Sequence, residues 1–332
     1  MSEPPPDRPA RGGPTDEEIT MDDRAAPRPA GTAGRARRPA PPSGLVVVDK
    51  PAGWTSHDVV GRLRRLAGTR RVGHAGTLDP MATGVLVVGV EKATRLLGHL
   101  ALTEKVYDAT FRLGATTDTD DAEGRTLAEV PAGHVTDEAI RAGVAALTGP
   151  ISQVPPQVSA IKVAGERAYR RARAGQEVEL AARPVTVHAF EVTGIRRAAA
   201  AGEVIQVDAT VRCSSGTYIR SLARDLGAAL GVGGHLTFLR RTRVGPYDLA
   251  AARTIEQLEQ DCAILPIEDA VAAAFPRMDV PEDQARLVAH GGRLRPAGLG
   301  PGPIGVFGPD GTLLALAEER GGAVRPLAVF VP

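Results

Sequence analysis

The chain of 332 residues lacks several features that mark whole classes of protein. Only 3% of its residues are aromatic, and its two cysteines, Cys213 and Cys262, cannot form a framework of several disulfides. This cysteine usage predicts a reducing compartment, the cytoplasm. Apolar runs such as Val85–Val90 are far shorter than the ~18 residues of a membrane-spanning helix. Because no basic segment followed by an apolar one stands at the start, no secretory signal and no membrane association are predicted.

Motifs for metals, nucleotides and hydrolysis are missing too. The seven histidines show no H-x-x-x-H spacing and the cysteines no C-x-x-C, so no metal site is predicted. A G-x-G-x-x-G match at residues 300–305 contains prolines and follows no strand, which indicates a turn. Residues 56–58 read Ser-His-Asp, but sequence neighbours cannot adopt the geometry of a triad. Residues 118–124 lack the pattern of a calcium loop and are interpreted as an acidic turn that can organise nearby arginines.

Three regions differ in composition. Residues 1–43 hold ten of the 27 prolines and one large aliphatic residue, Ile19, while seven acidic side chains balance seven arginines. Such a segment cannot bury enough apolar surface to offset the entropy of ordering, so a disordered tail is predicted there. Residues 44–270 are predicted to form the main domain. Residues 271–332 contain short apolar segments separated by glycine and proline, which predicts a small β-rich domain.

Hydrophobic periodicity predicts a mixed α/β fold. Strands are expected at residues 45–48, 85–90, 106–113, 186–195, 204–213, 305–307, 313–316 and 327–331. Helices are expected at residues 56–66, 93–100, 140–147 and 218–230. Ser56 is predicted to be the N-cap of the first helix, and residues 69–84 are predicted to form a long loop.

The loop at residues 70–84 has the composition of a functional site. It combines glycines, two arginines, His74 and one carboxylate, Asp79, just before an apolar strand. Glycine permits close backbone approach and proline restricts its neighbour, so Asp79 is expected in a fixed, irregular conformation. An isolated Asp-Pro pair usually marks only a turn. The surrounding residues favour a site loop instead.

Residues 73–84, Gly-His-Ala-Gly-Thr-Leu-Asp-Pro-Met-Ala-Thr-Gly, resemble the motif G-H-x-G-T-L-D-P-x-A-T-G of the TruB family of tRNA pseudouridine synthases. Further stretches resemble this family in the same order, at residues 50–56, 105–109, 153–162, 213–220 and 239–245. The resemblance spans residues 44 to about 247, and the C-terminal part resembles a small RNA-binding PUA domain. Val158 departs from the family pattern, where an aromatic residue is common.

The resemblance implies a pseudouridine synthase fold, with an active cleft crossing a large, mainly antiparallel sheet. Members isomerise the T-loop uridine of tRNA at position 55. The N1–C1′ glycosidic bond breaks, the uracil rotates, and C5 bonds to C1′. This chemistry requires a base taken out of the stack. It involves no redox change or net hydrolysis, so no cofactor is implied. The implied partner is the T-arm of tRNA, and the implied oligomeric state is a monomer.

Three residues correspond to the family's catalytic positions. Asp79 matches the catalytic carboxylate, which can act as a nucleophile or as a base. Arg220 matches the arginine that pairs with this carboxylate and keeps it ionised. Tyr107 matches the tyrosine that stacks on the flipped uracil and takes the proton from C5; such stacking is worth ~1–3 kcal/mol per base.

Three further residues correspond to substrate-binding positions. His74 resembles the residue that fills the space left by the extruded base. Lys50 and Leu239 match residues that line the pocket, although each could equally have a structural role, Lys50 by supporting the loop.

Two other functions use the same motifs. One is an RNA-binding or RNA-folding protein without catalysis, and the other is the catalytic subunit of a guide-RNA-dependent pseudouridylase. A glycoside hydrolase would need two opposed carboxylates, and only Asp79 lies in a convincing site.

The net charge of +1 does not argue against an RNA partner, because it averages over unlike segments. Residues 44–100 carry a net charge of +4, residues 151–190 of +3 and residues 191–260 of +2. Residues 101–150 carry −5 and residues 261–332 carry −3. The basic segments contain Asp79 and Arg220, which predicts a basic cleft that attracts phosphates.

Overall fold

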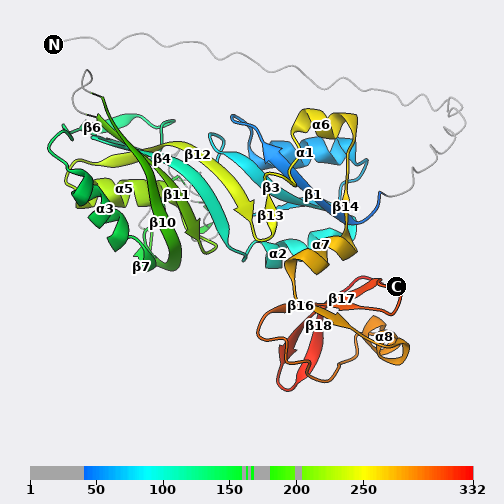
Figure 1. Ribbon diagram of the computed structural model, residues 1–332. Helices are drawn as coiled ribbons and strands as arrows, with labels where there is room; N and C mark the ends of the chain where they lie inside the picture. Colours follow the sequence, from blue (N-terminus) through cyan, green and yellow to red (C-terminus); the bar gives the residue numbers. More distant parts are fainter. Residues whose placement is uncertain (1–40, 159–161, 164–165, 168–179, 199–203, 332) are drawn as a thin grey trace, which may run out of the picture. The chain divides into compact units, whose positions relative to one another are not determined.

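The computed structural model describes residues 41–158, 162–163, 166–167, 180–198 and 204–331 (Figure 1). The tail predicted at residues 1–43 lies outside this range up to residue 40, and so does part of the motif at residues 153–162, namely residues 159–161. In the part of the chain that the structure describes, no helix is long and apolar enough to cross a membrane.

The largest sheet among the described residues has ten strands. Its strands are β1 (Gly44–Lys50), β2 (Val72–Ala75), β3 (Thr83–Val90), β4 (Lys105–Leu113), β7 (Gly149–Gln153), β10 (Arg183–Ala198), β11 (Val204–Cys213), β12 (Gly234–Val244), β13 (Tyr247–Asp248) and β14 (Leu265–Pro266). The order is β14-β1-β3-β12-β4-β11-β10-β7, with β2 paired to β3 and β13 to β12. Only the β3–β12 pairing within this sheet is parallel. The predicted mixed α/β fold with a large, mainly antiparallel sheet is therefore confirmed.

The other elements that the structure describes are helices and three smaller sheets. The helices are α1 (Ser56–Leu66), the 3-10 helix η1 (Glu91–Leu96), α2 (Leu97–Leu100), α3 (Asp137–Ala146), α5 (Ile219–Ala229), α6 (Ile255–Gln260), α7 (Ile267–Ala274) and α8 (Glu282–Ala289). Two hairpins pair β5 (Ala115–Thr117) with β6 (Thr126–Glu129) and β8 (Lys162–Val163) with β9 (Glu166–Arg167). The C-terminal sheet has the order β15 (Arg277–Asp279), β16 (Pro303–Phe307), β17 (Leu313–Arg320) and β18 (Ala323–Val329).

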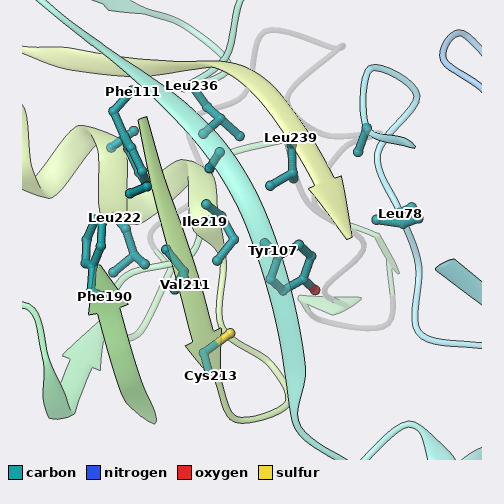
Figure 2. Close-up of a cluster of buried hydrophobic side chains, with 14 of the residues drawn as sticks. Leu78, Tyr107, Phe111, Phe190, Val211, Cys213, Ile219, Leu222, Leu236 and Leu239 are labelled. Atoms are coloured by element: carbon teal, nitrogen blue, oxygen red, sulfur yellow. The ribbon is translucent and has the colours of Figure 1, made fainter. Parts of the chain in front are cut away.

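The two faces of the large sheet have different environments. Burial alternates residue by residue along β4 and β11, the pattern of antiparallel strands that cover a core on one side only. On the buried face, Phe111 and Val211 belong to the same core as Ile219 and Leu222 of α5 (Figure 2). On the other face the strands are joined by polar pairs, for example from Thr110 Oγ1 to Asp208 Oδ1 at 2.7 Å. The strand residues that line the cavity, Lys105 and Tyr107 of β4 and Leu239 and Arg241 of β12, are buried.

The prediction that Ser56 caps the first helix is wrong. Thr55 is the N-cap: its side chain accepts from the backbone N–H of Asp58, whose carboxylate accepts from Thr55 N in return. Ser56 Oγ is used elsewhere, accepting from Leu78 N at 2.9 Å and donating to Leu78 O at 3.2 Å. The start of α1 is thereby tied to the residue that precedes Asp79.

Two other local predictions need correction. Residues 69–84 are not a continuous loop, because Val72–Ala75 form β2 and pair antiparallel with the end of β3. A segment rich in glycine shows little strand pattern of its own, and the neighbouring apolar strand supplies the pairing. Residues 93–100 are divided between η1 and the single turn α2, whereas a continuous helix was expected. The short apolar segments near the C-terminus do form strands, as predicted.

Candidate active site

Asp79 lies in the connection between β2 and β3, and backbone contacts fix its position. Its carbonyl oxygen accepts from Ala82 N at 3.1 Å, which closes a turn around Pro80. The carbonyl of Pro80 in turn accepts from Gly53 N at 2.8 Å. The loop that carries the carboxylate is therefore held by the segment that follows β1.

Gly84 shows why this loop needs glycine. Its φ is +100°, and a Cβ at this position would lie 2.2 Å from the carbonyl oxygen of Arg241 on β12. No other residue fits such a close backbone approach, and a positive φ disfavours L side chains as well. The expectation that glycine permits close backbone packing in this loop is confirmed at Gly84.

Arg220 binds the carboxylate of Asp79 with two parallel hydrogen bonds. Nε donates to Oδ2 at 3.0 Å and Nη2 donates to Oδ1 at 3.2 Å. The arginine side chain is only 4% exposed, whereas that of Asp79 is 34% exposed. A bidentate guanidinium fixes the direction of a carboxylate and stabilises its ionised form. The accessible side of Asp79 is left for a ligand.

Three further oxygens contact the guanidinium of Arg220 and fix its position. Its guanidinium also contacts Thr119 O at 2.8 Å, Val158 O at 3.0 Å and Asp121 Oδ2 at 3.4 Å. One turn later in α5, Arg224 Nη1 lies 3.0 Å from Asp120 Oδ2. The acidic turn at residues 118–124 thus organises two arginines of one helix, which agrees with its interpretation from sequence.

A cavity of about 260 Å³ opens beside the Asp79–Arg220 pair. Four of the residues predicted for the site line it: Asp79, Tyr107, Arg220 and Leu239. The rest of the lining is Gly76, Thr77, Leu78, Ala101, Lys105, Ser214, Gly216, Thr217, Tyr218, Ile219 and Arg241. The cavity is slightly smaller than the ~300–1,000 Å³ of typical ligand pockets.

Tyr107 lies on β4 between Val211 of β11 and Arg241 of β12 in the strand register. Its side chain belongs to the core, and Figure 2 shows its hydroxyl directed away from Val211 and Ile219. Burial raises the pKa of the phenol, and the nearby Arg241 opposes this only in part. Tyr107 is therefore neutral at pH 7, with its ring at the cavity wall.

Lys50 does not line the cavity but ties the surrounding loops together. It is fully buried, and its ammonium donates to Pro51 O at 2.9 Å, Trp54 O at 2.7 Å and Pro80 O at 3.2 Å. Burial lowers its pKa to about 8, although the carboxylate of Asp79 opposes that shift. These contacts give Lys50 a structural connection to the Asp79 turn.

His74 also lies outside the cavity lining, on β2. Its ring makes an edge-to-face contact with His57, with the ring centroids 5.7 Å apart. Its buried Nδ1 has no hydrogen-bond partner among the described residues. Burial, followed by the proximity of His57 and Arg241, lowers its pKa, so the ring is neutral at pH 7.

Family models match almost the whole of the folded chain. Residues 64–219 match the N-terminal domain of the TruB family pseudouridylate synthases. Residues 220–272 match the tRNA pseudouridylate synthase B C-terminal domain, and residues 275–331 match the C-terminal model of tRNA pseudouridine synthase II. The chain belongs to the TruB family. Enzymes of this family isomerise uridine in tRNA to pseudouridine, and this chain is one of them.

Curated relatives resemble this chain over most of its length. The chain is 66% identical over 288 residues to tRNA pseudouridine synthase B of Thermobifida fusca (strain YX), covering 86% of this chain and 98% of that protein. It is 60% identical over 291 residues to the protein of the same name from Streptomyces griseus subsp. griseus, covering 87% and 97%. The TruB resemblance stated from the motifs is confirmed.

Solved structures of more distant relatives share the fold of this TruB enzyme. A crystal structure of the archaeal box H/ACA sRNP Nop10-Cbf5 complex aligns with a TM-score of 0.65 at 28% identity, covering 94% of each chain. An H/ACA RNP bound to a substrate RNA containing 2′-deoxyuridine aligns with the same TM-score and identity, covering 87% of this chain and 85% of that one.

Sequence reasoning gave no role to two cations of the TruB site, Lys105 and Arg241. Arg241 is 1% exposed, and its guanidinium donates to the carbonyls of Val85 (2.7 Å), Gly76 (3.2 Å) and Thr77 (3.4 Å). The strand contains three arginines within four residues, so the sequence alone did not reveal which of them faces the cavity. Lys105 opens the motif at residues 105–109, whose recognised member was Tyr107.

Proposed function

We propose that this TruB enzyme isomerises the uridine at position 55 in the T-loop of tRNA, with Asp79 as the catalytic carboxylate. One observation carries the proposal: the ionised, directed carboxylate of Asp79 opens into a cavity of about 260 Å³ beside Tyr107 and Leu239. A uracil ring taken out of the RNA stack would bring its C1′ to this carboxylate.

Asp79 starts the reaction in its ionised form. The two hydrogen bonds from Arg220 stabilise the anion, and they leave part of the carboxylate accessible to the ribose. As a nucleophile Asp79 would form a bond to C1′, and as a base it would remove the C2′ proton. Both routes break the N1–C1′ bond while the base stays in the cavity.

Tyr107 and Leu239 form the walls against which the base stacks. Both side chains are more than nine-tenths buried and line the cavity. Burial raises the pKa of Tyr107, so its hydroxyl is neutral before the reaction. A neutral phenol can take the C5 proton only while it gives up its own. The carboxylate of Asp79, released when C5 bonds to C1′, is a suitable acceptor for that proton.

The remaining predicted residues support the substrate less directly. His74 carries a neutral ring, which suits a residue that replaces the extruded base in an apolar stack. Lys50 keeps the Asp79 turn in place through Pro80. We assign catalysis to residues 44–270 and a PUA-like, RNA-binding role to residues 271–332. The enzyme is proposed to act as a monomer on the T-arm in the cytoplasm, where tRNA is modified.

Incubation of the purified chain with unmodified tRNA, followed by mapping of the changed uridine, tests this function. We expect one pseudouridine, at position 55, without any guide RNA. A T-arm fragment should react as well, because the cavity admits a single base and the chain itself supplies Asp79 and Arg220. Strong tRNA binding without conversion would favour the RNA-folding alternative. Conversion only after addition of a guide RNA would favour the guide-dependent alternative.

A further inference from the structure

The active-site cavity contains two buried cations that have no carboxylate partner in the described part of the chain. Lys105 is 5% exposed, and its ammonium donates to Thr103 O at 2.6 Å and to Ala101 O. Arg241 donates to three backbone carbonyls and has a side-chain hydrogen bond with Tyr107. Among the described residues, no carboxylate oxygen lies within ion-pair distance of either side chain. Both side chains line the cavity.

This arrangement gives the cavity an excess of positive charge. Its lining contains the cations Lys105, Arg220 and Arg241, but Asp79 is the only carboxylate among the lining residues that the structure describes. Asp79 and the buried Asp121 both pair with Arg220, and among the described residues neither carboxylate forms an ion pair with Lys105 or Arg241. Burial of an uncompensated charge is costly. A cation kept in a reaction cavity at such a cost indicates that an anion forms or binds beside it.

The strand geometry directs both cations toward the base. Lys105 and Tyr107 are two residues apart on β4 and share its buried face, which separates them by ~6.6 Å at 3.3 Å per residue. Arg241 is opposite Tyr107 on β12. A base stacked on Tyr107 would therefore have Lys105 at one edge and Arg241 beside it. An ammonium has three donors, and two of those of Lys105 are used by Thr103 and Ala101.

We propose that Lys105, with Arg241 beside it, binds and stabilises the uracil anion that exists after the glycosidic bond has broken. This inference deepens the proposed function and depends on it. When the N1–C1′ bond breaks, its electron pair stays on N1 and spreads over O2 and O4. C1′ meanwhile bonds to Asp79, or C2′ loses a proton to Asp79. Both routes therefore leave a uracil anion in the cavity.

The later steps convert the uracil anion into the neutral base of the product. After the base has turned, an electron pair of the ring forms the C5–C1′ bond. In the nucleophile route the bond between C1′ and Asp79 breaks at this step, and in the base route C2′ regains its proton from Asp79. The C5 proton then leaves through Tyr107, and one proton returns to N1. A cation fixed before the reaction stabilises the anion without reorganisation, and such a preorganised donor is worth ~10²–10³ in rate.

A backbone phosphate is the other anion that these cations could meet. The cavity is small, and its walls include Tyr107, Leu239 and Ile219, which suit a base. The uracil anion is therefore the favoured ligand. A phosphate contact would instead contribute to the affinity for tRNA and to its salt dependence.

Substitution of Lys105 by Met and by Gln, combined with a change of leaving group, tests the proposal. Single-turnover rates of cleavage of the N1–C1′ bond are measured with tRNA containing uridine and with tRNA containing 5-fluorouridine at the target position. Because C5 of 5-fluorouridine carries fluorine and no proton, loss of the original nucleoside is followed in both cases. Fluorine withdraws electrons and stabilises the uracil anion by itself. We expect Lys105→Met to lose ~10²-fold in rate with uridine but much less with 5-fluorouridine, with the Kd for tRNA unchanged. Lys105→Gln retains donors for Thr103 and Ala101 and should show the same selective loss.

Each other outcome overturns the proposal. Equal losses with both bases would indicate a structural role, and full activity of both variants would indicate none. A raised Kd with a shallower salt dependence would indicate a phosphate contact. Arg212→Met is the matched control, because it removes a cation of β11 that instead pairs with Glu104 outside the cavity lining. If the wild-type chain forms no pseudouridine, the proposed function fails. If it does and Lys105 proves dispensable, only this inference fails.

Discussion

Arg220 and Asp79 are 141 residues apart in the chain, yet Nε and Nη2 of the arginine meet the two carboxylate oxygens at 3.0 and 3.2 Å. The arginine comes from the first turn of α5, and the carboxylate from the turn before β3. Because Arg220 is almost fully buried and Asp79 is not, one side of the pair is closed to solvent and the other is accessible.

Asp79→Asn should abolish pseudouridine formation and leave tRNA binding largely intact. The amide can neither attack C1′ nor accept a proton, whereas affinity for RNA comes mainly from cations that meet phosphates. Tritium release from tRNA labelled at C5 of uracil measures turnover, and filter binding measures the Kd. Substantial release by the variant would refute the catalytic assignment of Asp79.

Replacement of Arg220 should affect both stability and catalysis. Arg220→Met removes the shared partner of Asp79 and the buried Asp121, and breaking a buried pair costs about 3 kcal/mol. Arg220→Lys keeps the charge but loses the planar fork that directs the carboxylate. We therefore expect the Lys variant to be more stable than the Met variant, with turnover well below wild type in both. Urea unfolding and tritium release give the two quantities, and wild-type turnover of Arg220→Lys would contradict the orienting role.

Tyr107→Phe should retain base stacking and lose proton transfer. The ring remains between β11 and β12, so we expect a nearly unchanged Kd for tRNA. The loss should appear in the step that removes the C5 proton, and a deuterium label at C5 should then slow the reaction more than in the wild type. Normal turnover by this variant would remove Tyr107 from the acid–base chemistry.

Gly84→Ala should destabilise the fold, because its Cβ would lie 2.2 Å from the backbone oxygen of Arg241. Gly53→Ala is the matched control: φ is also positive there, at +78°, but a Cβ would meet nothing within 4 Å. The control measures only the left-handed strain, ~1–2 kcal/mol. We expect Gly84→Ala to lose clearly more in urea unfolding. Equal losses would show that the close approach of β3 and β12 has no energetic weight.

The sequence predicts local features of this site, such as its strands, better than the contacts between distant residues. The alternation along β4 and β11 was readable because each strand covers a core on one side. The meeting of Asp79, Tyr107 and Arg220 was expected only from the family resemblance, since no periodicity encodes a contact across 141 residues.

Other features depend on tertiary pairing that the sequence does not display. Thr55 and Ser56 are both good N-caps, and the choice between them depends on the bond from Ser56 to Leu78. Likewise, Arg241 faces the cavity while Arg240 binds Asp49, and an irregularity in the strand register follows Arg241. Such a bulge changes which side chain faces the core.

The charge of Lys105 leads to a prediction about the pH dependence of the rate and of the stability. Burial lowers the pKa of Lys105 from 10.5 to about 8, and Arg241 adds to the shift. The ammonium is therefore present below pH 8 and is lost as the pH rises through this value. If it stabilises the uracil anion, the single-turnover rate of the wild type should fall above about pH 8. In Lys105→Met, the decrease in rate that is caused by deprotonation of Lys105 should be absent.

Stability should change in the opposite direction over the same range. Between pH 8 and 10.5 the folded lysine is neutral while the unfolded one still binds a proton, so the free energy of unfolding rises with pH. Lys50 has a similarly lowered pKa, which makes the difference between wild type and Lys105→Met the quantity to measure. Urea unfolding at pH 7.5 and 9.5 measures this difference in the free energy of unfolding. We expect the wild type to gain stability relative to Lys105→Met as the pH rises. A difference that is independent of pH would show that Lys105 is not a buried cation.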